Sequence, residues 1–140
     1  MEIKKNMELI HQFLKSEEGE QLDFKQSINK SPRIAKTLVA FANTQGGKIL
    51  VGVSDNKKIM GIDPEEEMYM INKANREYCV PPVHCTYEIF EIDYLGDQEL
   101  EEEIYILVVN VSKSTKQHAF RGHDGKLLPY QRIADMTKPI

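Results

Sequence analysis

The stretch 36–55 places the tightest limits on how this chain can fold. Ile34, just before this stretch, and Leu38 and Phe41 within it recur at the spacing of one helix face. Gly46-Gly47 follows, and adjacent glycines allow backbone angles that let a chain leave a helix and reverse tightly. The run 49–53 is short, apolar and rich in β-branched residues, which is typical of a strand covered on both faces. The stretch therefore predicts a helix, a glycine turn and a buried strand.

The sequence Gly46-Gly47-Lys48 in this turn raises the question of a phosphate-binding loop. A Walker A loop follows the pattern G-x-x-x-x-G-K-[ST], in which backbone N–H groups cradle phosphates and the last hydroxyl binds Mg²⁺. Here Ala42 stands at the first glycine position and Ile49 at the hydroxyl position. The spacing therefore excludes a Walker-type nucleotide site.

Length and composition are those of one soluble domain. The chain has 140 residues, of which 41% are hydrophobic and 29% charged, so a single domain over residues 1–140 can bury a sizeable core. No stretch approaches the run of about 20 apolar residues that crosses a bilayer, so no membrane partner is expected. Two cysteines, Cys79 and Cys85, are too few for a disulfide framework. A reducing cytoplasm is therefore the expected location.

Charge is distributed unevenly along the chain, although the net charge is only −4. Residues 1–62 carry 10 Lys and Arg against 7 Asp and Glu. Residues 63–111 carry 2 against 13, and residues 112–140 carry 6 against 2. If the two basic ends meet in space, they form a basic surface that suits a nucleic-acid partner in spite of the acidic total.

Periodicity and turn residues predict an order of helices and strands along the chain. Ser/Asp-Pro pairs at 31–32 and 63–64 each supply an N-cap followed by a proline that starts a helix. Helices are expected at 4–16, 32–44 and 64–78, and strands at 20–26, 48–53, 58–62, 83–94, 103–111, 117–121 and 126–132. The acidic segment 95–102 is expected to form an exposed hairpin loop, and the chain to end in a polar tail after Arg132. This order indicates an α+β fold, with a mixed β-sheet and helices packed on it.

Two further expectations concern the strands. Alternation in the segment 20–26 puts Leu22 and Phe24 on one side and Asp23 and Lys25 on the other. We therefore expect a half-buried strand whose outer face is charged and wet. One sheet is expected to hold the strands at 21–25, 48–53 and 103–111, with the helix at 32–44 packed on it.

Four blocks of residues, taken in order, resemble the Schlafen AlbA-type domain, once described as a divergent AAA domain. The chain matches the family pattern E-x-x-x-x-E-F-K at residues 18–25, A-F-A-N-T-x-G-G at 40–47, G-V-x-D at 52–55 and the final Y-x-R strand at 130–132. The match covers about residues 17–133, which is most of the chain. The resemblance implies a compact α+β module that is described as DNA- or RNA-binding. In bacteria such a module usually precedes other domains in transcriptional regulators.

Some animal members of this family cleave RNA with three carboxylates of the module. Carried over by motif, those positions are Glu18, Asp23 and Asp55, which the resemblance implies as catalytic and metal-binding residues. A nuclease would use them to hold Mg²⁺ or Mn²⁺, whereas a binding module requires no cofactor. Asp23 stands where the family more often has a glutamate, which is one methylene longer. The ordinary alternative for each carboxylate is a solvated position at a helix end, on a strand or in a turn.

Four cations are candidates for contacts with phosphates, namely Lys25, Arg33, Lys36 and Arg132. Phosphate contacts position a nucleic acid without reading its sequence. For each cation alone, a place on the ordinary solvated surface is the alternative. Aromatic residues are sparse and Trp is absent, so a base-stacking platform of the RRM kind is not expected.

The sequence therefore predicts a module that binds DNA or RNA within a bacterial-type transcriptional regulator. One alternative is a metal-dependent ribonuclease, and another is nucleotide (ATP) binding, against which the failed Walker pattern counts. A protein-interaction domain that uses the acidic loop 95–103 is a further alternative. The sequence leaves open whether the chain forms a homo-oligomer and whether further C-terminal domains follow it in a longer protein.

Overall fold

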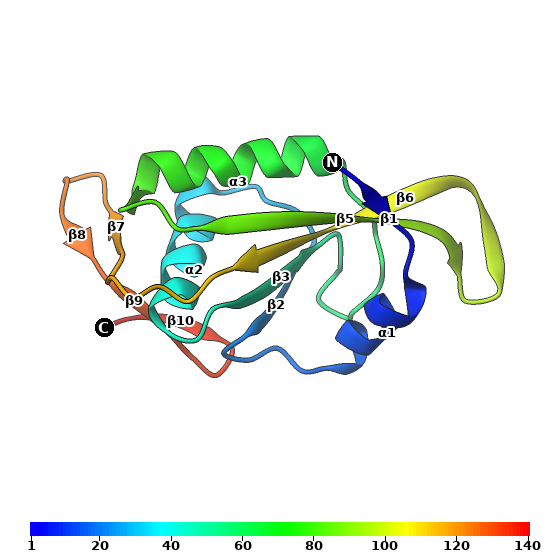
Figure 1. Ribbon diagram of the computed structural model, residues 1–140, viewed down its shortest axis with the longest axis horizontal. Helices are drawn as coiled ribbons and strands as arrows, with labels where there is room; N and C mark the ends of the chain where they lie inside the picture. Colours follow the sequence, from blue (N-terminus) through cyan, green and yellow to red (C-terminus); the bar gives the residue numbers. More distant parts are fainter.

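The computed structural model describes all of residues 1–140. The chain forms three helices and ten strands; the helices alternate with the first three strands, and the other seven strands follow the last helix (Figure 1). The helices are α1 (Met7–Lys15), α2 (Ser31–Asn43) and α3 (Pro64–Tyr78). The strands are β1 (Ile3–Lys4), β2 (Leu22–Lys25), β3 (Gly47–Val51), β4 (Cys79–Val80), β5 (Cys85–Leu95), β6 (Gln98–Val111), β7 (Ala119–Arg121), β8 (Leu127–Leu128), β9 (Tyr130–Ile133) and β10 (Met136–Pro139).

A mixed five-stranded sheet forms the centre of the molecule, in the order β1-β5-β6-β3-β2. Its outer pairs, β1 with β5 and β2 with β3, are parallel, and its inner pairs are antiparallel. Strands β2, β3 and β6 therefore share one sheet, as the sequence predicts, and the α+β class is confirmed. The parallel β2–β3 pair arises because α2 carries the chain back between them, which is the crossover that parallel strands require.

Helices cover both faces of this sheet because the strands alternate their apolar side chains. Ile49 and Val51 of β3 are buried against α2 and α3, whereas Leu50 is buried on the opposite face with Ile10 of α1. Figure 1 shows α3 above the strands and α1 below them. The predicted packing of the second helix on the sheet is confirmed. Its apolar face, from Ile34 to Ala42, supplies much of the larger core.

The C-terminal strands pack around the end of α2 and are fastened there by Asn43. Its amide nitrogen donates hydrogen bonds to the backbone oxygens of His118 (2.8 Å) and Tyr130 (2.9 Å). Its amide oxygen accepts a hydrogen bond from the His118 N–H at 2.8 Å. The neighbouring Thr44 hydroxyl accepts a hydrogen bond from the Arg132 N–H at 2.8 Å. The A-F-A-N-T block thus joins the first half of the chain to its last strands.

The strand expected at 58–62 is not formed. Only one isolated antiparallel bridge is present there, between Val53 and Ile59. The backbone of Gly61 has φ +82°, and an added Cβ would lie 2.8 Å from the Ile104 Cβ. The segment therefore turns sharply against β6 instead of extending a ladder.

Three segments differ from the sequence expectations because each pairs with another strand. The acidic segment 95–102 is mostly strand, because β5 and β6 pair up to a turn at Gly96-Asp97. The expected polar tail forms β10, which pairs with β9. The N-terminal β1 was not expected, and it lies parallel to β5. None of the three helices combines the length and hydrophobicity that a membrane-spanning segment requires.

Candidate nucleic-acid interface

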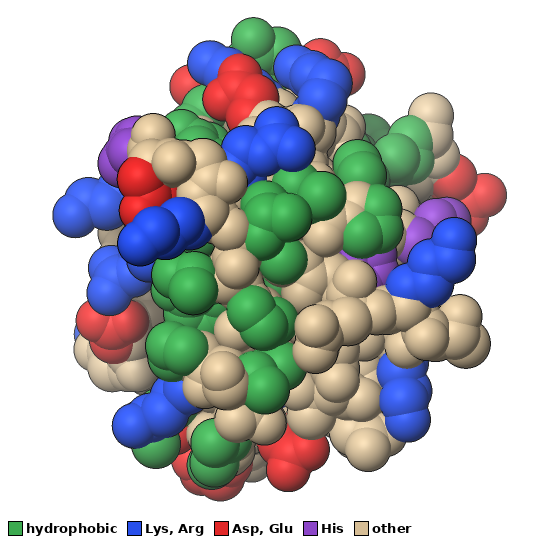
Figure 2. Space-filling model, turned by 90° about the vertical axis from the view of Figure 1, so that its left-hand side faces the viewer, with side chains coloured by type: hydrophobic (Ala, Val, Ile, Leu, Met, Phe, Trp, Pro, Cys, Tyr) green, Lys and Arg blue, Asp and Glu red, His purple; other side chains and the backbone are tan.

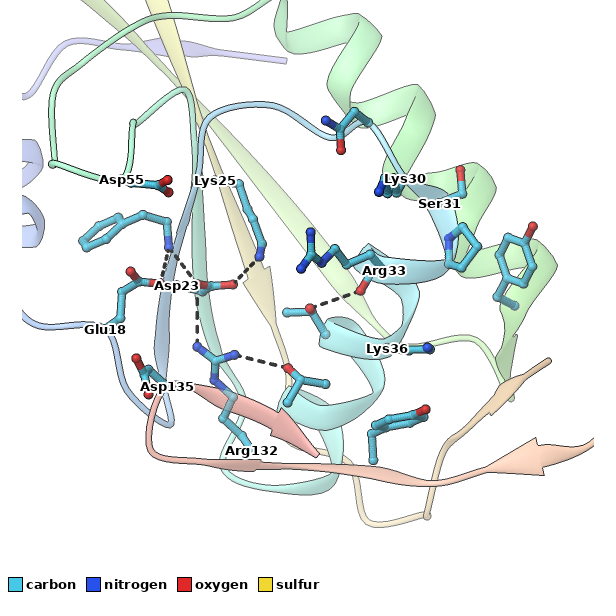
Figure 3. Close-up of a pocket in the computed structure, with 17 residues that line it drawn as sticks. Glu18, Asp23, Lys25, Lys30, Ser31, Arg33, Lys36, Asp55, Arg132 and Asp135 are labelled. Atoms are coloured by element: carbon cyan, nitrogen blue, oxygen red, sulfur yellow. Dashed lines mark hydrogen bonds and ion pairs between the residues drawn. The ribbon is translucent and has the colours of Figure 1, made fainter. Parts of the chain in front are cut away.

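The main hollow of the molecule is a cleft of about 1040 Å³. Strand β2, the first two turns of α2, and the β9–β10 hairpin each contribute residues to its walls (Figure 3). All seven residues singled out from the sequence line this one cleft: Glu18, Asp23, Lys25, Arg33, Lys36, Asp55 and Arg132. The acidic β5–β6 hairpin projects at the opposite end of the molecule from β7 and β8 (Figure 1). The fold thus gathers basic residues from both ends of the chain away from the acidic middle.

The start of α2 supplies the free positive charge of the cleft. Lys30 is the N-cap residue of this helix and makes no side-chain capping bond. Lys30 and Arg33 are both exposed, and neither forms an ion pair within the chain. Lys36 follows one turn later and lines the same wall. The N-terminal end of a helix is itself positive, so this wall favours an anionic ligand.

Asp23 is buried at the floor of the cleft, and this corrects the expected wet face of β2. Its exposed fraction is only 4%. Its Oδ1 lies 3.6 Å from the Arg132 Nη2, and its Oδ2 lies 3.2 Å from the Lys25 Nζ. The Lys25 contact is an ion pair without hydrogen-bond geometry, so Oδ2 has no hydrogen-bond partner. Two cations therefore compensate a carboxylate that water scarcely reaches.

Arg132 forms part of the cleft wall, and most of its donors are used inside the protein. Its exposed fraction is 4%. Its Nε donates to the Gly19 backbone oxygen at 2.9 Å, and its Nη1 donates to the Thr137 hydroxyl at 3.2 Å. The guanidinium also lies over the Phe41 ring, 4.9 Å from the ring centroid. The structure therefore gives Arg132 a bracing position between β2, β9 and β10.

Glu18 lies beside Asp23, and this neighbour changes the pKa of the Glu18 carboxyl. A hydrogen bond with Asp23 and partial burial raise the pKa of Glu18 from 4.5 to about 7. Both carboxyls also accept a hydrogen bond from the Phe24 N–H, at 3.4 Å for Glu18 and 3.1 Å for Asp23. Glu18 is therefore partly protonated near neutral pH, which reduces the negative charge of the cleft.

The elevated pKa of Glu18 predicts a measurable pH dependence. Its raised value means that this carboxyl stabilises the fold fully below its ordinary pKa of 4.5, and the contribution is lost as pH rises through about 7. In a carboxyl NMR titration we expect a midpoint near pH 7 for Glu18. Asp23→Asn should bring that midpoint down, because the amide can donate to a charged Glu18. A midpoint below pH 5 in the unaltered protein would contradict the raised pKa of Glu18.

The predicted three-carboxylate metal site is only partly assembled. Glu18 and Asp23 are adjacent, and Asp55 lines the same cleft. However, no three His, Cys, Asp or Glu side chains come close enough together to hold one metal ion. The oxygens of Asp23 face Lys25 and Arg132, where a divalent cation would meet positive charge. This arrangement of donors does not fit a shared Mg²⁺ or Mn²⁺ site.

Several residues of the cleft were missed by the reasoning from sequence. Lys30 was the one that could have been found, since it directly precedes the Ser31-Pro32 helix start. Asp135 belongs to the turn of the unexpected β9–β10 hairpin. Tyr78 and Tyr130 come from the ends of distant elements. No local pattern indicates that these two rings lie near the cations of α2.

The fold and the cleft motifs agree with a family match. The family model for the Schlafen, AlbA_2 domain matches residues 18–140. The chain therefore belongs to the Schlafen AlbA_2 family.

Two individual proteins are similar to this chain, one in sequence and one in structure. An uncharacterized ATP-binding protein of Ureaplasma parvum is 44% identical over 52 residues, which are 35% of this chain and 15% of that protein. A crystal structure of the DIP2311 protein from Corynebacterium diphtheriae has a TM-score of 0.53 and 16% identity, covering 86% of this chain and 25% of that one. The second likeness concerns the fold alone. The chain thus spans only a minor part of the length of either relative.

Proposed function

We propose that this domain binds nucleic acid, DNA or RNA, through the phosphate backbone, as a module of a bacterial-type transcriptional regulator. The observation that supports this proposal is the single cleft in which Lys25, Lys30, Arg33 and Lys36 gather. Phosphate contacts from Lys, Arg and helix N-termini account for much of the affinity of such proteins. Part of the negative total of −4 comes from the acidic β5–β6 hairpin, which lies away from α2 (Figure 1).

The four cations do not contribute equally to this proposal. Lys25 is held by Asp23 at 3.2 Å, and Lys36 lies 5.0 Å from the centroid of the Phe120 ring. Lys30 and Arg33 are exposed and free of ion pairs, so they can turn toward a phosphate at little cost. Lys30 and Arg33 are therefore the cations whose loss should matter most, and Arg33 is chosen for the test.

A charge reversal at Arg33 tests the proposal. We expect Arg33→Glu to weaken binding of a labelled 20-nucleotide probe about tenfold or more, because an attractive contact becomes repulsive. Fluorescence anisotropy at two salt concentrations measures this affinity and its salt dependence. Arg76→Glu is the matched control, since Arg76 is exposed in the last turn of α3 and does not line the cleft. The control changes the net charge equally and should leave affinity almost unchanged.

Two results would count against the proposal. Equal weakening by both variants would show that only overall charge matters, and affinity that does not depend on salt would indicate a partner other than a polyanion. The same assay with Mn²⁺ and an RNA probe also tests the ribonuclease alternative. We expect the RNA to remain intact, since the carboxylates do not form a shared metal site.

A second candidate ligand is ATP, because a relative of this chain is named an ATP-binding protein. A triphosphate would use the same cations at the start of α2, since the Gly46-Gly47 turn lacks the Walker pattern. Competition by ATP against the labelled probe separates the two candidates. Displacement at micromolar ATP would favour nucleotide binding, whereas displacement only at millimolar ATP would favour the nucleic acid.

A further inference from the structure

Three aromatic rings from separate elements meet at one edge of the cleft. They belong to Tyr78 at the end of α3, Phe120 of β7 and Tyr130 of β9, and we call them the aromatic cluster. The Tyr78 and Phe120 rings are stacked with centroids 5.7 Å apart, and the Phe120 and Tyr130 rings meet edge to face at 6.2 Å. The Lys36 Nζ lies 5.0 Å from the Phe120 centroid and 5.6 Å from that of Tyr130. A cation of the cleft is thus in direct contact with the cluster.

Within the cluster, Tyr78 is the ring that still offers surface to a ligand. Phe120 and Tyr130 are 7% and 8% exposed, whereas Tyr78 is half-buried and lines the cleft. Next to it, β8 pairs with β7 and carries Leu127 and Leu128, which are 50% and 46% exposed. Figure 2 shows this end of the molecule, where hydrophobic side chains gather in the middle and Lys and Arg side chains surround them.

From this arrangement we infer that the cleft takes single-stranded rather than double-stranded nucleic acid, with unpaired bases on Tyr78 and the adjoining apolar surface. This inference rests on the proposed function and names the form of its ligand. In a single strand the phosphates would lie on Lys30 and Arg33, and the apolar base faces would be free to stack. A duplex hides its base faces and presents phosphates outward, so it would leave the apolar surface without a suitable partner.

The basic wall of the cleft and the aromatic cluster adjoin each other. Lys36 belongs both to the basic wall and to the aromatic cluster. A strand that runs along the start of α2 therefore passes from Arg33 over Lys36 to Tyr78 without leaving the protein surface. Contacts of this kind are tolerant of sequence, because every base has an apolar face. The inference is thus one of strand form, with no preference for a particular base.

The test compares one 20-nucleotide sequence as a single strand and as a duplex, in DNA and in RNA, by fluorescence anisotropy. We expect the single strand to bind at least about tenfold more tightly than the duplex, and Tyr78→Ala to weaken single-strand binding about tenfold while changing duplex binding little. Tyr78→Phe should retain single-strand affinity, because it keeps the ring. Tyr69→Ala is the matched control, since Tyr69 lies on the same helix, is 63% exposed and does not line the cleft.

Folding of each variant is checked by its urea unfolding midpoint, so that a loss of affinity is not confused with a loss of structure. Equal affinity for the two forms, or equal weakening of both by Tyr78→Ala, overturns the inference. If Arg33→Glu still weakens both forms in that case, the proposed function stands without the preference for single strands. Absence of binding by either form overturns both. Loss of self-association in Tyr78→Ala, with single-strand affinity unchanged, would assign the apolar surface to a protein contact and also overturns the inference.

Discussion

Arg132→Ala is expected to lower the free energy of unfolding by about 4 kcal/mol. The substitution removes the guanidinium that faces Asp23, whose side chain is only 5% exposed. Lys25 remains on one side of that carboxylate, but the oxygen that faces Arg132 would have no cation beside it, although it keeps the Phe24 N–H. The loss also breaks the link from β9 to the Gly19 backbone. Removing one partner of a buried ion pair is costly because it leaves a charge in a place that water cannot reach.

Urea unfolding followed by circular dichroism measures this effect. Arg76→Ala serves as the control at an exposed arginine and should change the free energy of unfolding by less than about 0.5 kcal/mol. The double variant Asp23→Asn/Arg132→Ala should lose less than Arg132→Ala alone, since no charge is then left unpaired. If Arg132→Ala lowers the free energy of unfolding by less than about 1 kcal/mol, Arg132 does not hold β2, β9 and β10 together. Arg132 would then again be a candidate for contacts with phosphates.

Gly47→Ala should also destabilise the fold strongly, by about 3 kcal/mol or more. The backbone at Gly47 has φ +152°, and an added Cβ would lie 2.5 Å from the Gln21 backbone oxygen. That oxygen accepts the hydrogen bond of the Lys48 N–H at 2.9 Å, which holds the start of β3 against the residues before β2. An alanine would therefore push apart two segments whose backbones are in contact, with no flexible side chain to yield.

The control for this prediction is another glycine of the same region. Gly19→Ala should be nearly neutral, because a Cβ added there meets no atom within 4 Å. Thermal unfolding of the two variants side by side gives the comparison. Equal melting temperatures for Gly47→Ala and the unaltered protein would mean that the β2–β3 edge can move apart freely.

Much of the fold was predictable where local patterns and tertiary packing agree. The helix, glycine turn and strand of 36–55 form as expected, because apolar spacing and the Gly-Gly pair favour the same structure. Strands β1 and β10 could not be predicted, since their side chains are largely exposed and only pairing with β5 and β9 defines them. The segment 58–62 misled the prediction because Ile59 and Ile62 pack against the two cores without forming a strand, and Met60 is 49% exposed.

The candidate site shows a similar division. The family motifs contain the three predicted carboxylates and two of the four predicted cations, Lys25 and Arg132, and all of these line the cleft. The burial of Asp23 could not be predicted, since Arg132, which lies far along the chain, covers it. The aromatic cluster was missed for the same reason, because its three rings come from α3, β7 and β9. The burial of Asp23 and the aromatic cluster thus both depend on contacts between distant segments, which the motifs do not contain.

The most direct test of the central claim is a map of backbone amide chemical shifts during titration with a 20-nucleotide single strand. We expect the largest changes at Lys25, Lys30 and Arg33, with little change at the turn Gly96-Asp97 of the acidic hairpin. Changes should saturate with the binding curve and shrink as salt is added. Shifts centred on the hairpin, or none at the start of α2 under saturating probe, would contradict the assignment of the cleft as the nucleic-acid interface.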